Sequence, residues 1–390
     1  MRNDRQRVPA IDAIRGMALF GILYVHLHDG YNGFPSVEGQ GWWNVAATWV
    51  YGELFLAKAY LVFSFLFGLG FALQLGRAEA RGCDFRGRFL WRLVLLFGFG
   101  IVNTLFYGGD ILMVFAVFGA ALVPFWRVRL PFAVAVALFL SAQCPFVFDA
   151  LFAQQSCLLA VCRTLDSHVS PMPEAAASSW AALARWNVTD GLWARLSYMI
   201  SSGRLGAMLA MFLWGMLAGR SGLYGVSAAT KPFWRSVAFA AAGAWVAILT
   251  LGGFFPLPQA HAWAQAIASW KNMAEASLFL GACFFTLEWP AWQMALRPFC
   301  AAGRASLSCY IVQNIVGTLL LFGWGMGLGE RLTAGESALL AASLFAVQSA
   351  VCLWWFRHYR FGPLEWLWRS ATYGHLQPLR QEDARAASCR

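Results

Sequence analysis

Long apolar segments recur from one end of this chain to the other, and they constrain its fold more than any other feature. Each segment holds few charged residues, and the short stretches between segments hold most of the arginines. A helix needs about 20 predominantly apolar residues to cross the hydrocarbon core of a bilayer. The pattern therefore predicts an all-α polytopic membrane protein. The expected spans, about ten on this criterion, lie near residues 13–28, 53–75, 90–107, 110–126, 130–148, 204–220, 236–256, 273–289, 305–325 and 336–356.

The composition agrees with a membrane protein and argues against a soluble one. The chain is 59% hydrophobic and only 12% charged, whereas soluble domains carry about 25% charged residues. Its net charge of +10 would suggest nucleic acid as a partner in a soluble domain. Here the arginines lie between apolar segments, where they set membrane orientation. We therefore expect the lipid bilayer as a partner, and not nucleic acid.

The distribution of arginine predicts the orientation of the chain. If the basic N-terminus is cytoplasmic, every second loop should be basic, and this alternation holds with both termini inside. An odd number of spans would break it, although 150–163 is ambiguous and an eleventh span or a re-entrant piece there stays open. We expect one multi-pass domain of the bacterial inner membrane over 1–375, an outer amphipathic cap within 149–203 and a polar cytoplasmic tail at 376–390.

Ionisable residues in the first span are the strongest functional signal. Eleven residues separate Arg15 from His26, which returns to within about 20° of the same helix face and rises about 16 Å. Asp29 lies three residues further on the same face, so it is a candidate to orient the imidazole. In an alternative interpretation, Arg15 is a snorkelling anchor and His26 an interfacial polar residue.

A second polar group follows the third span. Asp110 comes directly after two glycines and precedes an apolar segment, a position typical of a carboxylate that caps a helix N-terminus. Because it is expected on the same outer side as His26, Asp110 is also a candidate partner for that imidazole.

Other polar residues are candidates for a substrate pocket or for helix pairing. Amides within a membrane usually bridge helices, which is one interpretation of Gln313 and Asn314. Glu53 and Lys58 are candidates to pair with each other, and the small residues of 65–71 predict a close helix contact. The candidate polar pocket comprises Trp42, Asn103, Gln313 and Asn314.

Several kinds of chemistry lack their motifs in this sequence. There is no GxxxxGK[ST] loop for an ATP-driven pump, and neither GxSxG nor HExxH is present. The nine cysteines form no CxxC pair and no zinc-like spacing, so we expect no metal site. Any chemistry is expected to depend on His26.

Five segments carry a family resemblance. "IDAIRGMALFGIL", "FSFLFGLGFAL", "GGDILMVFAV", "GRASLSCYIVQ" and "FRFGPLEWLWRSATY" occur in order between residues 9 and 375. Together they resemble the YeiB-like bacterial membrane proteins, domain-of-unknown-function family 418. That family is grouped with transmembrane acyltransferases, including acyltransferase type 3 enzymes and the heparan glucosaminide acetyltransferase.

Two positions depart from the YeiB-like pattern. Its members usually have Asn where this chain has His26, and a His where this chain has Val102. The type 3 acyltransferases carry an Arg, ten intervening residues and then a catalytic His in their first span, which Arg15 and His26 reproduce. The resemblance thus implies a YeiB-like frame with an acyltransferase-like first helix.

The function implied is O-acyl transfer from cytoplasmic acyl-CoA, with acetyl as the default group, to a hydroxyl of a sugar or natural product. His26 would be the general base, oriented by Asp29 or Asp110, or would carry a transient acyl group. The competing interpretations are a transporter without chemistry and a structural subunit; the oligomeric state, a homodimer included, stays open. Candidates to bind the phosphates of acyl-CoA are Arg15, Arg77, Arg81, Arg86, Arg88 and Arg92.

Overall fold

The computed structural model describes residues 9–151, 172–224, 227, 229–254, 261–287 and 289–381. Within them the chain is helical, and its only extended pairings are two isolated bridges. The helices up to residue 151 are α1 (Pro9–His28), η1 (Gly30–Asn32), α2 (Trp42–Val50), η2 (Tyr51–Phe55), α3 (Ala59–Glu79), α4 (Arg86–Thr104), α5 (Leu112–Gly119), α6 (Leu122–Phe125), α7 (Leu130–Ser141) and α8 (Cys144–Leu151).

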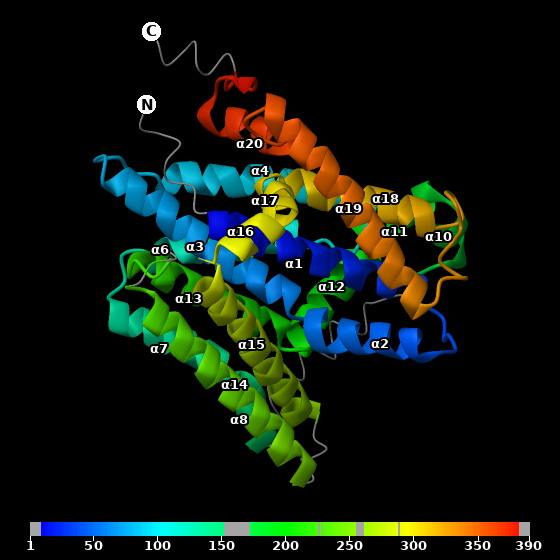
Figure 1. Cartoon of the computed structure of the whole chain (residues 1–390), viewed down its shortest axis with the longest axis horizontal. Coiled ribbons are helices and arrows are strands. Elements are labelled where there is room, and N and C mark those ends of the chain that lie inside the picture. The colour runs from blue at the N-terminus through cyan, green and yellow to red at the C-terminus, as the bar shows by residue number, and fades with distance from the viewer. Residues whose placement is uncertain are drawn as a thin grey trace.

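The second half begins with three short helices and continues with longer ones (Figure 1). They are α10 (Glu174–Ser178), α11 (Trp180–Val188), α12 (Asp190–Ser201), α13 (Arg204–Arg220), α14 (Lys231–Phe254), α15 (His261–Thr286), α16 (Pro290–Ala295), α17 (Arg297–Arg304), α18 (Ser306–Leu321), α19 (Ala334–His358) and α20 (Pro363–Tyr373).

The predicted all-helical membrane fold is confirmed. Among the described residues, four helical stretches are long and apolar enough to cross a membrane, and a fifth arises if α12 and α13, bent by 73°, form one span. Each predicted apolar segment is largely helical, and 110–126 is interrupted between α5 and α6. The ambiguous stretch 150–163 lies outside the described residues except for its first two positions.

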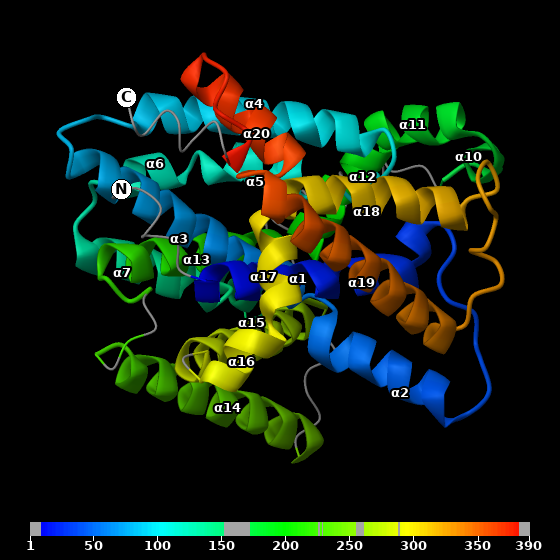
Figure 2. The ribbon, with the colours of Figure 1, turned by 45° about the horizontal axis from the view of Figure 1, so that its top comes forward.

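Helix α1 runs through the middle of the molecule (Figures 1 and 2). It packs against α3, α17, α18 and α19, and Figure 2 shows α4 and α20 on one side of it and α14 toward the other. Its sequence explains this position, because apolar or small residues occupy nearly all of its circumference and most are buried. Functional residues on α1 therefore lie inside the protein.

Two helix crossings depend on glycine. A Cβ atom at Gly68 of α3 would collide with the backbone of α13 at Phe212, and one at Gly215 of α13 would collide with Phe65 of α3. This confirms the predicted small-residue contact in 65–71. Gly16 of α1 and Gly303 of α17 make a second crossing of the same kind.

Helix α18 begins at a buried carboxylate from α20. Glu365 accepts hydrogen bonds from the backbone amides of Leu307 and Ser308 at 2.7 and 3.2 Å, and from the Ser308 hydroxyl at 2.6 Å. The amides at a helix N-terminus lack partners within the helix, and a carboxylate there satisfies them. The block FGPLEWLW thereby fixes where α18 starts.

The expected pairing of Glu53 with Lys58 is wrong. Lys58 pairs with Glu275 of α15 at 2.9 Å, and Glu53 pairs with Lys271 of the same helix at 2.8 Å. Glu53 lies in the π-turn η2, and Lys58 follows the non-helical Leu56 and the positive-φ Ala57. Helical spacing therefore does not apply between the two residues.

Candidate functional site

Four polar side chains from four segments form a chain of hydrogen bonds in the centre of the protein. His26 Nδ1 lies 3.1 Å from Asn314 Oδ1, and Asn314 Nδ2 donates to Asn103 Oδ1 at 3.1 Å. Asn103 Nδ2 then donates to Asp110 Oδ1 at 2.8 Å. Both asparagines are fully buried and Asp110 is 1% exposed. Helices α1, α18 and α4 and the start of α5 thus hold a relay that ends on an imidazole.

The carboxylate at the far end sets the direction of this relay. Both oxygens of Asp110 accept hydrogen bonds, one from Asn103 Nδ2 and the other from the backbone amide of Met113, so the Asn103 amide has its nitrogen toward Asp110. Asn103 in turn fixes Asn314, whose oxygen then faces His26 and requires a proton on Nδ1. The Nε2 nitrogen of His26 is left with its lone pair, which is the form of imidazole that a general base needs.

His26 lies on the wall of a cavity of about 520 Å³, which is called the outer cavity after the predicted orientation of the chain. Small-molecule sites typically measure about 300–1,000 Å³. Tyrosines surround the imidazole, and the ring centroids of Tyr107 and Tyr31 lie 4.5 and 5.3 Å from its own. A ligand in this cavity can therefore reach the ring of His26, while the amides and carboxylate of the relay lie behind it.

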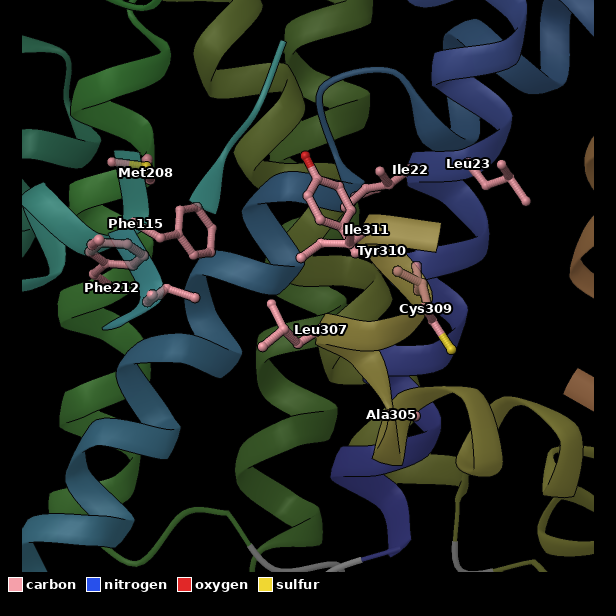
Figure 3. Close-up of a cluster of buried hydrophobic side chains, with 14 of the residues drawn as sticks. Ile22, Leu23, Phe115, Met208, Phe212, Ala305, Leu307, Cys309, Tyr310 and Ile311 are labelled. Atoms are coloured by element: carbon pink, nitrogen blue, oxygen red, sulfur yellow. The ribbon is translucent and has the colours of Figure 1, made fainter. Parts of the chain in front are cut away.

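A second cavity of about 320 Å³ lies along the other half of α1 and is called the inner cavity after the same prediction. Arg15, Arg92, Arg304 and Arg369 line it, together with Gln74. Ile22, Ile111 and Tyr310 line both cavities, and Figure 3 shows Tyr310 beside Ile22 at the edge of the apolar cluster. The two cavities therefore meet at Tyr310, between the arginines and His26.

The structure does not pair Asp29 with His26. Asp29 follows the last residue of α1, and its backbone amide still donates to the carbonyl oxygen of Val25 at 2.9 Å. The helical bonding therefore reaches Asp29, but its carboxylate takes a different partner. Its carboxylate accepts a hydrogen bond from Tyr51 at 2.5 Å, and the Tyr51 ring stacks on His28 at 3.8 Å. Asp29 still lines the outer cavity.

Asp110 serves both of the roles that its position suggested. One oxygen accepts the backbone amide of Met113 at 2.9 Å, in the first turn of α5. The other accepts Asn103, through which Asp110 is connected to His26 by two amides and not by direct contact.

The arginines predicted to bind phosphate divide into two groups. Arg15 and Arg92 line the inner cavity. Arg77, Arg81 and Arg88 are exposed and line neither cavity.

Arg86 is committed to a carboxylate on the loop before α4. Its guanidinium binds both oxygens of the exposed Asp84. These hydrogen bonds hold the pKa of Asp84 well below its usual value.

None of the four residues predicted for the polar pocket lines either cavity. Trp42 is 83% exposed at the start of α2 and lines neither cavity. Gln313 is buried and donates to Gln348 of α19 at 2.7 Å, so it bridges two helices. Asn103 and Asn314 belong to the relay.

Sequence reasoning did not single out four residues that line the cavities. Arg304 and Arg369 of the inner cavity occur in the sequence only within two segments that carry the family resemblance, GRASLSCYIVQ and FRFGPLEWLWRSATY. Arg195 and Arg204 of the outer cavity had no signal at all, because an isolated arginine outside a predicted span is ordinary.

Two family models match different parts of the chain. Residues 218–375 match the family described as protein of unknown function (DUF418). Residues 7–168 match the catalytic region of heparan-alpha-glucosaminide N-acetyltransferase. YeiB of Escherichia coli K12, an uncharacterized protein, is 26% identical over 94% of this chain and 96% of its own length. The YeiB-like resemblance is confirmed.

Two further relatives extend the YeiB-like similarity over nearly the whole chain. The uncharacterized protein YxaH of Bacillus subtilis strain 168 is 29% identical, with 96% of each chain covered. An uncharacterized 39.9 kDa protein of Bacillus acidopullulyticus is 26% identical with the same coverage. His26, Asn103 and Asp110 fall in the part similar to the acetyltransferase, and Asn314 in the part that matches DUF418.

Proposed function

We propose that this protein is a membrane-embedded O-acyltransferase that moves an acyl group, acetyl by default, from cytoplasmic acyl-CoA to a hydroxyl of a sugar or natural product. The observation that carries the proposal is the relay from Asp110 to His26, which leaves Nε2 of a cavity-lining imidazole unprotonated. The similarity of residues 7–168 to an acetyltransferase catalytic region supports the same chemistry.

In the proposed reaction His26 acts as general base. Its Nε2 takes the proton of the acceptor hydroxyl while that oxygen forms a bond to the thioester carbon. The carbon–sulfur bond then breaks, and the thiolate leaves with the proton from the imidazolium. The negative Asp110, connected through two amides, favours the imidazolium that forms in between. An acyl-histidine on Nε2 is the covalent variant of this scheme.

Tyr310 has the geometry to assist at the junction of the cavities. Its hydroxyl oxygen accepts the backbone amide of Ile111 at 3.3 Å. The hydroxyl hydrogen is then available to donate to the carbonyl oxygen of a thioester placed between the two cavities, where negative charge develops during attack.

The inner cavity fits the donor by its charge. Guanidinium groups bind phosphate oxygens with two parallel hydrogen bonds. Four arginines and one carboxylate, Glu365, line the cavity, and Glu365 is already bound to the start of α18. The arginines are Arg15, Arg92, Arg304 and Arg369. An acyl chain that extends from there past Tyr310 would enter the outer cavity at His26. We place the inner cavity on the cytoplasmic side of the inner membrane. In this arrangement the protein has ten spans with both termini inside, one domain over 1–375 and a tail beyond it.

One observation favours a transporter as the second candidate. Helices α12 and α13 meet at 73° beside the outer cavity, and discontinuous helices are common at the binding sites of transporters. A transporter would move the acceptor without consuming acyl-CoA.

The test is acyl transfer by the purified protein in lipid vesicles. Labelled acetyl-CoA is supplied with a panel of hydroxylated acceptors, and products are measured by mass spectrometry. His26→Ala should lower transfer by about 10² to 10⁴, while His28→Ala, a neighbour outside the relay, should retain it. Full transfer by a folded His26→Ala protein would remove His26 from the mechanism.

A further inference from the structure

The outer cavity contains two arginines without a carboxylate partner among the described residues. The Arg195 guanidinium donates to the backbone oxygen of Gly108 at 2.8 Å. Arg204 lies over the rings of Tyr198 and Tyr60, at 4.7 and 5.6 Å from their centroids. No ion pair within 4.0 Å joins either arginine to a carboxylate in this part of the chain.

Both carboxylates in the neighbourhood are already engaged. Asp29 accepts from Tyr51, and Asp110 accepts from Asn103 and from the backbone of Met113. Arg195 lines the same cavity as His26, and its backbone partner Gly108 lies two residues before Asp110, so the arginine is close to the relay. A cation held beside an apolar membrane interior without an anion is costly, and a bound anion would compensate for it.

Three nitrogen atoms of residues that line the outer cavity also indicate an anionic ligand. Asn187 Nδ2, Trp186 Nε1 and Arg195 Nε are buried and have no hydrogen-bond partner within the described ranges. All three residues line the outer cavity, and Asn187 is 1% exposed. Each of these atoms is a donor. Buried polar atoms are almost always paired, so a ligand with several acceptor oxygens would match these donors.

We propose that the outer cavity binds an acceptor that carries an oxyanion, a carboxylate or a phosphate, close to the hydroxyl that reacts. The oxyanion contacts Arg195 and the nearby nitrogens of Asn187 and Trp186, and the hydroxyl faces Nε2 of His26. The position of the hydroxyl rests on the proposed function. The binding of the anion does not, because it depends only on Arg195 and its neighbours.

The volume and lining favour a ring compound of modest size. Tyr31, Tyr60, Tyr107 and Trp186 line the cavity of about 520 Å³, and aromatic faces pack well against sugar rings. An acidic or phosphorylated sugar combines such a ring with the required oxygens. A neutral sugar would leave the two arginines without a carboxylate or phosphate at ion-pair distance.

The test compares three probes that differ in charge: methyl glucuronide, glucose 6-phosphate and methyl glucoside. Binding to the purified full-length protein is measured by isothermal titration calorimetry, without acyl-CoA. At least one anionic probe should bind about tenfold more tightly than the neutral one, the effect of one charge-assisted hydrogen bond. The two anionic probes distinguish a carboxylate site from a phosphate site. Equal affinity for all three probes, or no binding by any, overturns the proposal.

Two variants test whether Arg195 causes the preference for anionic over neutral probes. Arg195→Gln should abolish this preference. Arg185→Gln should retain it, because Arg185 is an exposed arginine of α11 that lines neither cavity. If Arg195→Gln does not fold, Trp186→Phe is the second variant. It keeps an aromatic ring but removes the indole N–H donor, and it should weaken binding of the anionic probe a few-fold. A preference that survives in folded Arg195→Gln, or no weakening in Trp186→Phe, contradicts the assignment.

The binding readout separates this inference from the proposed function. His26→Ala should bind the anionic probe as the wild type does, even though transfer is lost. If the wild type never transfers an acyl group but shows Arg195-dependent binding, the acyltransferase proposal fails and the anion site stands.

Discussion

The imidazole of His26 lies 3.1 Å from the side-chain oxygen of Asn314, which comes 288 positions later in the chain. This contact joins α1, in the part similar to the acetyltransferase catalytic region, to α18, in the part that matches DUF418. Neither part contains the relay alone. The site is therefore complete only when α18, from the second half of the chain, packs against α1.

Asp110→Asn tests whether the far end of the relay controls the imidazole. An asparagine can donate as well as accept, so the amides of Asn103 and Asn314 lose their fixed direction and Nε2 gains a proton in part of the molecules. We expect kcat for acyl transfer to fall by at least about tenfold, because a wrong imidazole tautomer is costly to catalysis. Steady-state kinetics with the KM for acyl-CoA as the internal reference provide the measurement.

A double-mutant cycle controls for general damage. In a His26→Ala background, Asp110→Asn should cause little further loss, since both changes disable one unit. Asp190→Asn, outside the relay and both cavities, should retain the wild-type rate. Independent, multiplicative losses from Asp110→Asn and His26→Ala would show that Asp110 acts only as a helix cap.

Helical geometry alone predicted the parts of the site that lie on one element. Arg15 and His26 share a stripe of α1, and the structure gives each of them one of two adjoining cavities. The spacing did not show the partner of Asp29, whose amide keeps a helical hydrogen bond to Val25 while its carboxylate binds Tyr51. That partner comes from another element, which the periodicity of α1 does not report.

Contacts between elements that lie far apart in the chain could not be predicted from the sequence. Asn103 and Asn314 were candidates for a pocket, but their order in the relay follows from how α4 and α18 pack. Val102, where the YeiB-like resemblance implies a His, is 51% exposed on α4, so a histidine there would not replace His26. Arg195 lacked a signal because its importance comes from its neighbours and not from any pattern.

Arg15→Gln tests the inner cavity as the donor site. Losing one charge-assisted hydrogen bond to phosphate costs about 1.5–3 kcal/mol, so the KM for acyl-CoA should rise roughly 10- to 100-fold. Arg81→Gln is the matched control, because Arg81 is exposed on the loop after α3 and lines neither cavity. A similar rise in KM for both variants would point to attraction by the whole basic face and not to this cavity.

Gly68→Leu tests the crossing of α3 and α13. The new side chain would meet the backbone of Phe212, which cannot move as a flexible side chain would. Overpacking of this kind costs about 1–3 kcal/mol, and we expect a lower unfolding temperature in detergent. Gly98→Ala on α4, where an added Cβ meets no atom within 4 Å, should be neutral or slightly stabilising. Equal stability of Gly68→Leu and wild type would mean that the helices separate at little cost.

Glu365→Gln tests the cap that positions Asn314. The glutamine amide would place a donor against the amides of Leu307 and Ser308 or against the Ser308 hydroxyl, where the carboxylate now accepts three hydrogen bonds. Hydrogen bonds to a buried charge are worth about 1.5–3 kcal/mol, so the unfolding temperature should fall. Glu330→Gln, at an exposed glutamate, controls for the loss of a negative charge.

Because α18 carries Asn314 two turns beyond the cap, a shifted α18 should also lengthen the contact to His26 and lower kcat. A loss of stability with unchanged kcat would show that the cap supports the fold but does not set the geometry of the relay.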